Sequence, residues 1–154
     1  MKTCNCELFF ARHGESEFNI GIHGIDSPLT VKGIGQAKLL KGEFDLIICS
    51  PLKRCRQTLE FSNFTYQHLE ISYLFRERVC DDSTMTEEEH CSYRGYQEPF
   101  DIFNSRINKF EKELEKRCKE YNKILLIRHS YFFNCWYTKE CHVPANGKII
   151  RLKI

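Results

Sequence analysis

The chain has 154 residues, of which 42% are hydrophobic and 29% charged, and its formal net charge at pH 7 is +2. This length suits one domain with a sizeable core, and the small net charge gives no indication of binding to nucleic acid or to an anionic membrane surface. Because the chain contains no run of about 18 apolar residues, no transmembrane helix is expected.

Cysteine is frequent, with nine residues, but the N-terminus lacks the apolar centre of a signal peptide. Free thiols in a reducing compartment are therefore expected, and with them a cytoplasmic location. Cys4 with Cys6, and Cys141 with His142, could suggest zinc, but neither pair has the spacing of a structural zinc site. No metal site is predicted.

The N-terminal part of the chain begins with a predicted strand, residues 7–11, in which apolar residues run without interruption. Residues 12–29 are rich in glycine and turn residues, which indicates a loop. Thr30 is a suitable N-cap for a helix that runs to about residue 41, and Gly42 can close that helix.

A second continuous apolar strand is expected at residues 44–49. The next helix is predicted to begin at Ser50-Pro51, because proline is tolerated at the first helical position, and to end near Ser62. Residues 69–74 give a third, weaker strand.

Residues 76–98 are polar and irregular, with Thr86 and Glu89 spaced as a capping box for a short helix. From Pro99 the pattern is strongly helical, because apolar residues recur on one face. These residues are Phe103, Ile107, Phe110 and Leu114. The remaining predicted elements are a strand at 124–128, a helix at about 130–139 and a strand at 148–154.

Strands that alternate with helices predict an α/β fold, a three-layer α/β/α sandwich whose mostly parallel central sheet is flanked by helices. In such folds ligands bind beyond the carboxyl ends of the strands. Arg12-His13 follows the first strand, Arg54 the second, and Arg128-His129 the strand at 124–128. We therefore expect these side chains to meet at one edge of the sheet.

Arginine and histidine side chains beside a helix start are typical of a phosphate site, since guanidinium groups bind phosphate bidentately and helix-start amides add donors. A neutral histidine there can attack a phosphoryl group. A carboxylic acid must then protonate the leaving oxygen.

The stretch Arg12-His13-Gly14-Glu15-Ser16 resembles the signature of the histidine phosphatase superfamily, which includes cofactor-dependent phosphoglycerate mutases. Further matches follow in the family's order over nearly the whole chain, and this ordered set is far more specific than a lone Arg-His-Gly. They are Asn19; 26–30 with Gly33, Gln36 and Ala37; 50–54 with Gln57 and Thr58; Glu77; His129; and 144–147.

The resemblance implies a phosphoglycerate mutase-like fold, with one domain over residues 1–154 and a short cap at about 76–98. It also implies a phosphoric monoester hydrolase of the histidine acid phosphatase type. His13 would be the nucleophile, and Glu77 the acid and later the base for water. The phosphoryl oxygens would be held by Arg12, Arg54 and His129, with Asn19 as a neutral donor and Ser130 as a further phosphate-binding residue. No cofactor or metal is implied, because the arginines do the work of a divalent ion.

Three departures from the family pattern bear on function. Arg128 and Ser130 stand where the family has a small residue and a glycine, and residues 79–82 replace a glycine-rich pattern. Because neighbours on a strand face opposite sides, Arg128 is expected to point away from the site, into a salt bridge behind the strand. The cap is also short, which favours a phosphatase, since a mutase must shield its phosphohistidine from water.

The leading hypothesis is a phosphatase that hydrolyses a phosphomonoester, carried by a small molecule or by a protein, through a phosphohistidine on His13. A phosphoglycerate mutase is the first alternative, and Arg78 beside Glu77 resembles a mutase feature. An inactive phosphate- or phosphopeptide-binding module is the second. The physiological substrate and the oligomeric state stay open. The other carboxylates that could be the acid are Asp82, Glu87, Glu88, Glu89 and Glu98.

Overall fold

The computed structural model describes residues 5–138 and 144–153 of the chain. Within them, five strands form one sheet in the order β3-β2-β4-β1-β5. β5 runs antiparallel to β1, and the other neighbouring strands are parallel. The strands are β1 (Glu7–Arg12), β2 (Lys41–Cys49), β3 (Asn63–Ile71), β4 (Lys123–Arg128) and β5 (Ile149–Arg151).

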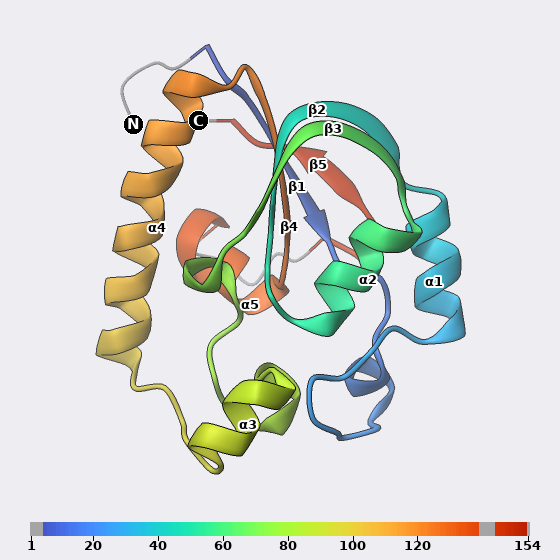
Figure 1. Ribbon diagram of the computed structural model, residues 1–154, viewed down its shortest axis with the longest axis vertical. Helices are drawn as coiled ribbons and strands as arrows, with labels where there is room; N and C mark the ends of the chain where they lie inside the picture. Colours follow the sequence, from blue (N-terminus) through green and yellow to red (C-terminus); the bar gives the residue numbers. More distant parts are fainter. Residues whose placement is uncertain (1–4, 139–143, 154) are drawn as a thin grey trace.

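The helices lie on both faces of this sheet, which makes the predicted α/β/α sandwich (Figure 1). They are α1 (Val31–Lys38), α2 (Lys53–Phe61), α3 (Glu87–Tyr93), α4 (Phe100–Glu120) and α5 (Ser130–Phe133), which continues as a π-helix (Asn134–Thr138). Short 3₁₀ turns occur at Glu17–Ile20, Tyr73–Phe75 and Asp82–Thr84. No helix in the described part of the chain combines the length and apolar character needed to cross a bilayer.

The central strand β4 shows why the sheet is covered on both faces. Ile124 and Leu126 pack in the core beneath α4 and α5, whereas Leu125 and Ile127 pack in the core beneath α1 and α2. All four side chains are fully buried. Because successive strand residues face opposite sides, a continuous apolar run such as this one needs a helical layer on each side.

Two helices begin with the caps that were predicted from the sequence. Thr30 caps α1 by accepting a hydrogen bond from the Gly33 N–H, and Thr86 and Glu89 form the predicted capping box of α3. The predicted inner face of α4, from Phe103 to Leu114, is also buried.

Several predicted boundaries are wrong. The first helix ends at Lys38, because Lys41 and Gly42 already pair with β3 as the start of β2. Pro51 precedes α2 rather than starting it, and β3 begins at residue 63 rather than 69. β3 is an edge strand and is largely exposed, so its sequence lacks the apolar run by which a strand is recognised.

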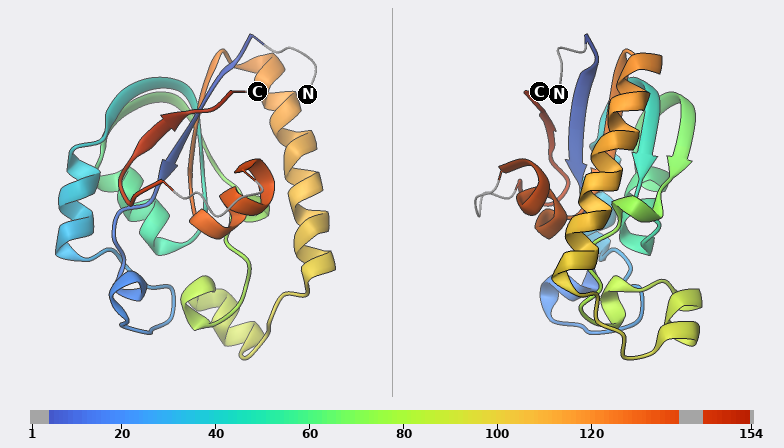
Figure 2. Two further views of the ribbon diagram at one scale, coloured as in Figure 1. Left: turned by 180° about the vertical axis from the view of Figure 1, so that it is seen from behind. Right: turned by 90° about the vertical axis from the view of Figure 1, so that its left-hand side faces the viewer.

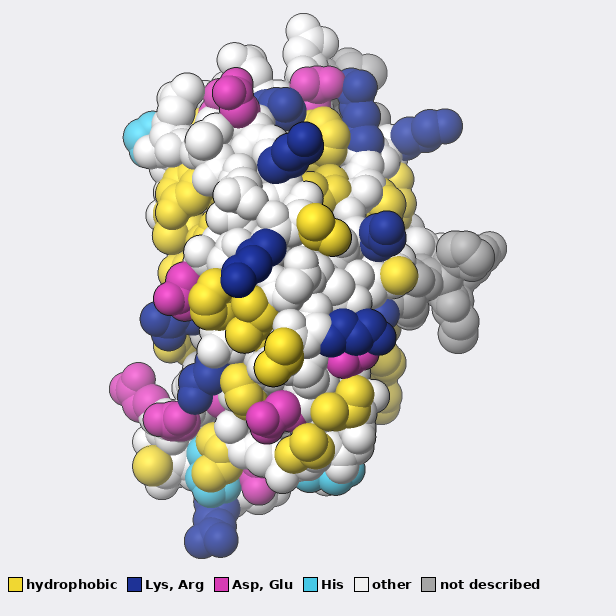
Figure 3. Space-filling view, turned by 90° about the vertical axis from the view of Figure 1, so that its right-hand side faces the viewer, with side chains coloured by type: hydrophobic (Ala, Val, Ile, Leu, Met, Phe, Trp, Pro, Cys, Tyr) yellow, Lys and Arg dark blue, Asp and Glu magenta, His cyan; other side chains and the backbone are white. Residues whose placement is uncertain are grey.

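The cap segment with α3 and the loop after β1 lie together at one end of the sheet, the end toward which β1 points (Figures 1 and 2). On the side of the molecule that shows α1, Lys and Arg side chains are interspersed with hydrophobic and acidic ones rather than gathered in one patch (Figure 3).

Candidate active site

The two Arg-His pairs lie side by side, because β1 and β4 are neighbours and Arg12 is in register with Arg128. The chain then places His13 and His129 together, with their ring centroids 5.2 Å apart and the ring planes tilted by 54°. Only 4% of His13 and 1% of His129 is exposed. The structure thus brings both imidazoles to the carboxyl end of the sheet, where ligands of α/β folds bind.

The environment of His13 determines which ring nitrogen carries the proton. Nδ1 lies 2.7 Å from the Gly14 carbonyl oxygen, and a carbonyl oxygen can only accept, so Nδ1 is the protonated nitrogen. Burial, followed by the charge of Arg54, lowers the pKa of His13 well below its usual 6.5. His13 is therefore neutral at pH 7, with the lone pair of Nε2 free to act as a nucleophile.

His129 is held from the other side by the turn after β2. Its Nε2 lies 2.7 Å from Ser50 Oγ and 3.3 Å from Cys55 Sγ. Burial also lowers the pKa of His129 well below 6.5, with a further lowering from Arg54. Burial raises the pKa of the Cys55 thiol to about 12, so that side chain is an uncharged neighbour of the histidine.

Arg54 is 4% exposed and lies in the first turn of α2, where a cation opposes the positive end of the helix dipole. A cation there is unfavourable for the helix dipole, whereas an anion bound beside it would be favoured. Its Nη1 donates to the Ser83 carbonyl at 2.7 Å and so also ties the cap to the site. Arg12 donates from Nη1 to the Pro144 carbonyl at 3.1 Å.

Glu77 is 9% exposed and is held by three backbone N–H groups. Oε1 accepts from Arg78 and Phe132 at 3.1 and 2.9 Å, and Oε2 from Tyr131 at 3.1 Å. Tyr131 and Phe132 belong to the first turn of α5, directly after His129. Burial raises the pKa of the Glu77 carboxyl, while Arg54 acts in the opposite direction.

The other carboxylates proposed as acids have different surroundings. Glu87, Glu89, Glu98 and Asp82 pair with Lys53, Arg76, Arg106 and His90, respectively, and Glu88 is exposed. Glu77 differs from these carboxylates because it lies buried beside the helix that follows His129.

Asn19 and Ser130 are less engaged with the centre. The Asn19 Oδ1 accepts from the N–H and Oγ of Ser16, each at 2.9 Å, so only its amide Nδ2 could donate to a phosphoryl oxygen. Ser130 is half-buried and is the first residue of α5.

Two residues outside the predicted set also hold the loop after β1. The Gly14 N–H donates to Thr58 Oγ1 at 3.0 Å, and Thr58 in turn donates to the Arg54 carbonyl at 2.7 Å. Asn146 donates from Nδ2 to the His13 carbonyl at 3.1 Å. Both residues lie in stretches that match the family pattern, but nothing in their spacing indicates these bonds.

The prediction for Arg128 is correct about where the side chain points, which is away from the site, and wrong about the group that it binds. Its side chain is fully buried in the aromatic core beneath α4 and α5 and donates from Nε and Nη2 to the Phe75 carbonyl, at 3.1 and 3.0 Å. Among the described residues it forms no salt bridge. The buried Phe75 carbonyl needs a donor, and the Arg128 guanidinium supplies it instead of binding a carboxylate.

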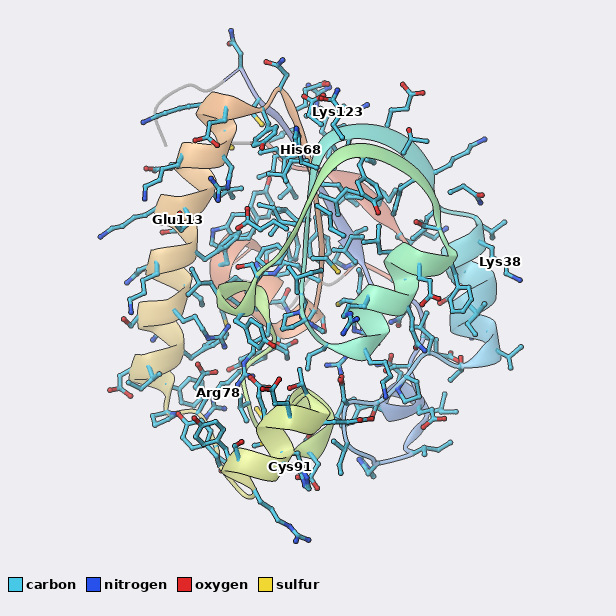
Figure 4. All side chains as sticks on the ribbon, viewed as in Figure 1. Lys38, His68, Arg78, Cys91, Glu113 and Lys123 are labelled. Carbon is cyan, nitrogen blue, oxygen red and sulfur yellow. The ribbon has the colours of Figure 1, made fainter. Side chains whose placement is uncertain are left out.

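Arg78 lies between α3 and the N-terminal end of α4 (Figure 4). Its guanidinium carbon is 3.9 Å from the centroid of the Phe100 ring, and its Nε donates to the Glu98 carbonyl at 2.9 Å. In residues 5–138 and 144–153, no cluster of His, Cys, Asp and Glu side chains could hold a metal ion. The pairs of Cys4 with Cys6 and of Cys141 with His142, whose spacing is unlike that of a zinc site, lie wholly or partly outside the described residues.

Comparison with known proteins agrees with this geometry. The sequence profile of the histidine phosphatase superfamily (branch 1) matches residues 8–148. The chain belongs to this superfamily. The predicted family and the predicted phosphatase function are therefore confirmed, while the histidine acid phosphatase type stays a prediction.

Individual members of the superfamily resemble the chain along most of its length. An adenosylcobalamin/α-ribazole phosphatase of Salmonella typhi is 28% identical over 164 residues, covering 90% of this chain and 81% of that protein. The corresponding protein of Escherichia coli strain K12 is 26% identical, covering 91% of this chain and 81% of that one. The crystal structure of the α-ribazole phosphatase from Shigella flexneri superimposes with a TM-score of 0.68 at 21% identity, covering 96% of this chain and 90% of that chain.

Proposed function

We propose that this histidine phosphatase hydrolyses phosphomonoesters through a phosphohistidine at His13. The observation that carries the proposal is the pair of buried neutral imidazoles, His13 and His129, with Arg54 beside them. The bond from His13 Nδ1 to the Gly14 carbonyl leaves Nε2 as the attacking atom. The relatives named above are phosphatases of phosphorylated small molecules, which supports a small-molecule substrate.

In the first step, His13 Nε2 forms a bond to phosphorus while the bond from phosphorus to the leaving oxygen breaks. Glu77 gives its proton to that oxygen. Burial raises the pKa of the Glu77 carboxyl, which favours the protonated form that the step needs. In the second step, Glu77 takes a proton from water, the water oxygen bonds to phosphorus, and the bond between phosphorus and Nε2 breaks to release phosphate.

The negative charge on the phosphoryl oxygens would be met by Arg12, Arg54 and His129, with Asn19 and Ser130 as neutral donors. Arg12 Nε is consistent with this role, because it is one of two buried side-chain donors, with Arg128 Nη1, that have no hydrogen-bond partner among the described residues. Such a donor costs free energy unless a ligand satisfies it. No metal is needed in this scheme, since fixed guanidinium groups supply the positive charge.

The test is turnover of p-nitrophenyl phosphate by His13→Ala, with trapping of the phosphoenzyme by acid-free denaturation. We expect loss of turnover and of the phosphoenzyme, because no other described side chain presents an unprotonated nitrogen in the same place. His13→Ala with wild-type turnover would disprove the proposal. Retained phosphate binding by a wild-type protein without turnover would instead favour the binding module.

Two finer points complete the proposal. Cys49, Cys55, Cys80, Cys91 and Cys135 are free thiols, which supports action in the reducing cytoplasm. A single domain over residues 1–154 is supported by the one sheet that spans β1 to β5.

A further inference from the structure

The segment that presents Glu77 has no regular secondary structure from residue 76 to residue 81, so its buried backbone groups need partners from elsewhere. Two arginines supply the partners of four successive carbonyl groups. Arg106 of α4 donates from Nη1 to the carbonyls of Leu74 and Arg76, at 3.0 and 2.8 Å, and from Nη2 to that of Glu77, at 3.3 Å. Arg128, at the end of β4, donates twice to the carbonyl of Phe75. We call Arg106 and Arg128 the carbonyl clamp.

Glu98 fixes the orientation of Arg106. Its two carboxylate oxygens accept from Nε and Nη2 of Arg106, at 2.8 and 2.7 Å, and both side chains are largely buried. Glu98 also accepts from the Val79 N–H at 3.3 Å. A planar guanidinium held bidentately on one edge presents its remaining donors in one direction only, which here is toward residues 74–77.

Arg128 packs against the side chains of Phe75 and Phe132. Its guanidinium carbon lies 3.3 Å from the centroid of the Phe75 ring and 3.2 Å from that of the Phe132 ring. Phe75 precedes Glu77 by two residues, and the Phe132 N–H donates to Glu77 Oε1. The same guanidinium therefore packs between the Phe75 ring, from the segment that carries Glu77, and the Phe132 ring, from the start of the helix that binds the Glu77 carboxylate.

Burying a cation in a protein core carries a large desolvation free energy. Replacing a buried charge by a hydrophobic side chain of similar volume often leaves the stability of a protein unchanged or raises it. Arg128 forms no salt bridge among the described residues, although its charge interacts with that of the Glu77 carboxylate. A requirement for donors at the buried Phe75 carbonyl, two residues before Glu77, accounts for an arginine at this position better than packing does.

We propose that Arg106 and Arg128 are positioning residues, which hold Glu77 where it can transfer its proton to the leaving-group oxygen. This rests on the proposed function, in which Glu77 is the acid. Neither arginine is among the groups that the proposed function assigns to the phosphoryl oxygens. Proton transfer needs donor and acceptor within about 3 Å, and a displacement of about 1 Å can lower the rate about 100-fold.

The test compares two substrates of similar shape that differ in their need for an acid. p-Nitrophenol leaves readily as an anion, whereas phenol is a poorer leaving group and gains more from protonation. The quantity compared is kcat/KM, because it covers the steps up to departure of the leaving group. Arg128→Met keeps the packing between the two rings but removes the donors, and Arg106→Lys keeps the charge beside Glu98 but cannot bridge the same acceptors.

We expect each variant to lower kcat/KM for phenyl phosphate by about 100-fold and that for p-nitrophenyl phosphate by much less. Inhibition by inorganic phosphate should be unchanged, because the groups around His13 are intact. Glu77→Gln shows the selectivity that complete loss of the acid produces. Arg117→Gln is the matched control, since Arg117 is on the same helix and pairs with Glu70 outside the clamp, and it should not alter the ratio of the two substrates.

Folding of each variant is checked by circular dichroism at the assay temperature. Should Arg106→Lys be unfolded, the double variant Arg106→Gln with Glu98→Gln removes both charges together and replaces it in the comparison.

Equal losses on both substrates for the clamp variants, with selective loss for Glu77→Gln, would overturn the positioning role and leave the proposed function intact. If Glu77→Gln itself is not selective while His13→Ala is inactive, Glu77 is not the acid and the clamp has no such role. If His13→Ala keeps wild-type turnover, the proposed function fails.

Discussion

Helix α1 meets the loop after β1 through two glycines, and this contact permits a sharp test. A Cβ added at Gly33 would lie 2.0 Å from the Glu15 carbonyl oxygen, and one added at Gly14 would lie 2.5 Å from the Gly33 carbonyl oxygen. At Gly35, on the exposed side of the same helix, an added Cβ would have no neighbour within 4 Å. Gly33→Ala and Gly35→Ala are thus the same substitution in one helix with opposite surroundings.

Alanine is better than glycine inside a helix by about 0.8–1 kcal/mol. Gly35→Ala should therefore raise stability by about 1 kcal/mol, which for a domain of this size raises Tm by about 2–4 °C. Gly33→Ala has the same helical gain, but the Glu15 carbonyl must move by about 1 Å to reach the shortest contact that real Cβ atoms show. Overpacking of this kind costs about 1–3 kcal/mol or more, so a net loss of stability is expected.

The displaced carbonyl is two residues from His13. A shift of about 1 Å there should lower kcat/KM for p-nitrophenyl phosphate by up to about 100-fold, whereas Gly35→Ala should leave it unchanged. Thermal unfolding followed by circular dichroism, together with steady-state kinetics on both variants, provides the two readouts. If Gly33→Ala matches Gly35→Ala in Tm and in kcat/KM, the contact between α1 and the loop does not hold the nucleophile in place.

Other predictions concern the surroundings of the two histidines. Thr58→Val should cost about 1–3 kcal/mol in urea unfolding, because it leaves the buried Gly14 N–H without its acceptor; Thr58→Ser keeps the hydroxyl and should be close to the wild type. Burial lowers the pKa of His13 and His129 below 6.5, so the unfolded chain binds more protons than the folded one as the pH falls below that value. The stability from their neutral forms is complete above about pH 6.5 and should fall below it by about 1.4 kcal/mol per pH unit for each histidine. The raised pKa of Glu77 opposes part of this fall. Urea unfolding between about pH 7 and 5 measures the slope, and a His13→Asn variant with the same slope would contradict the assignment. Finally, turnover should persist after dialysis against a chelator, because the proposed phosphate site consists of arginine and histidine side chains; loss of activity that a divalent cation restores would argue against this site.

Local patterns were sufficient for much of the framework. The apolar runs of β1 and β4 predicted buried strands because both of their faces pack against helices. The caps at Thr30 and Thr86 lie within three residues of the groups they bind. The order of strands and of the residues at their ends also placed His13 and His129 at one edge, since the carboxyl ends of parallel strands coincide.

The sequence by itself therefore determined the α/β class, the family and the meeting of the two histidines at one edge of the sheet, because these depend on short-range pattern and on motif order. Only the tertiary structure decided the features that depend on partners far apart in the chain. The start of α2 is one, since its Lys53 N–H is capped by Asp26 from another loop. The surroundings of Glu77 are another, because the donors from Arg106 and Arg128 reach its backbone only after α4 and β4 have packed together, and no spacing along the chain encodes that contact.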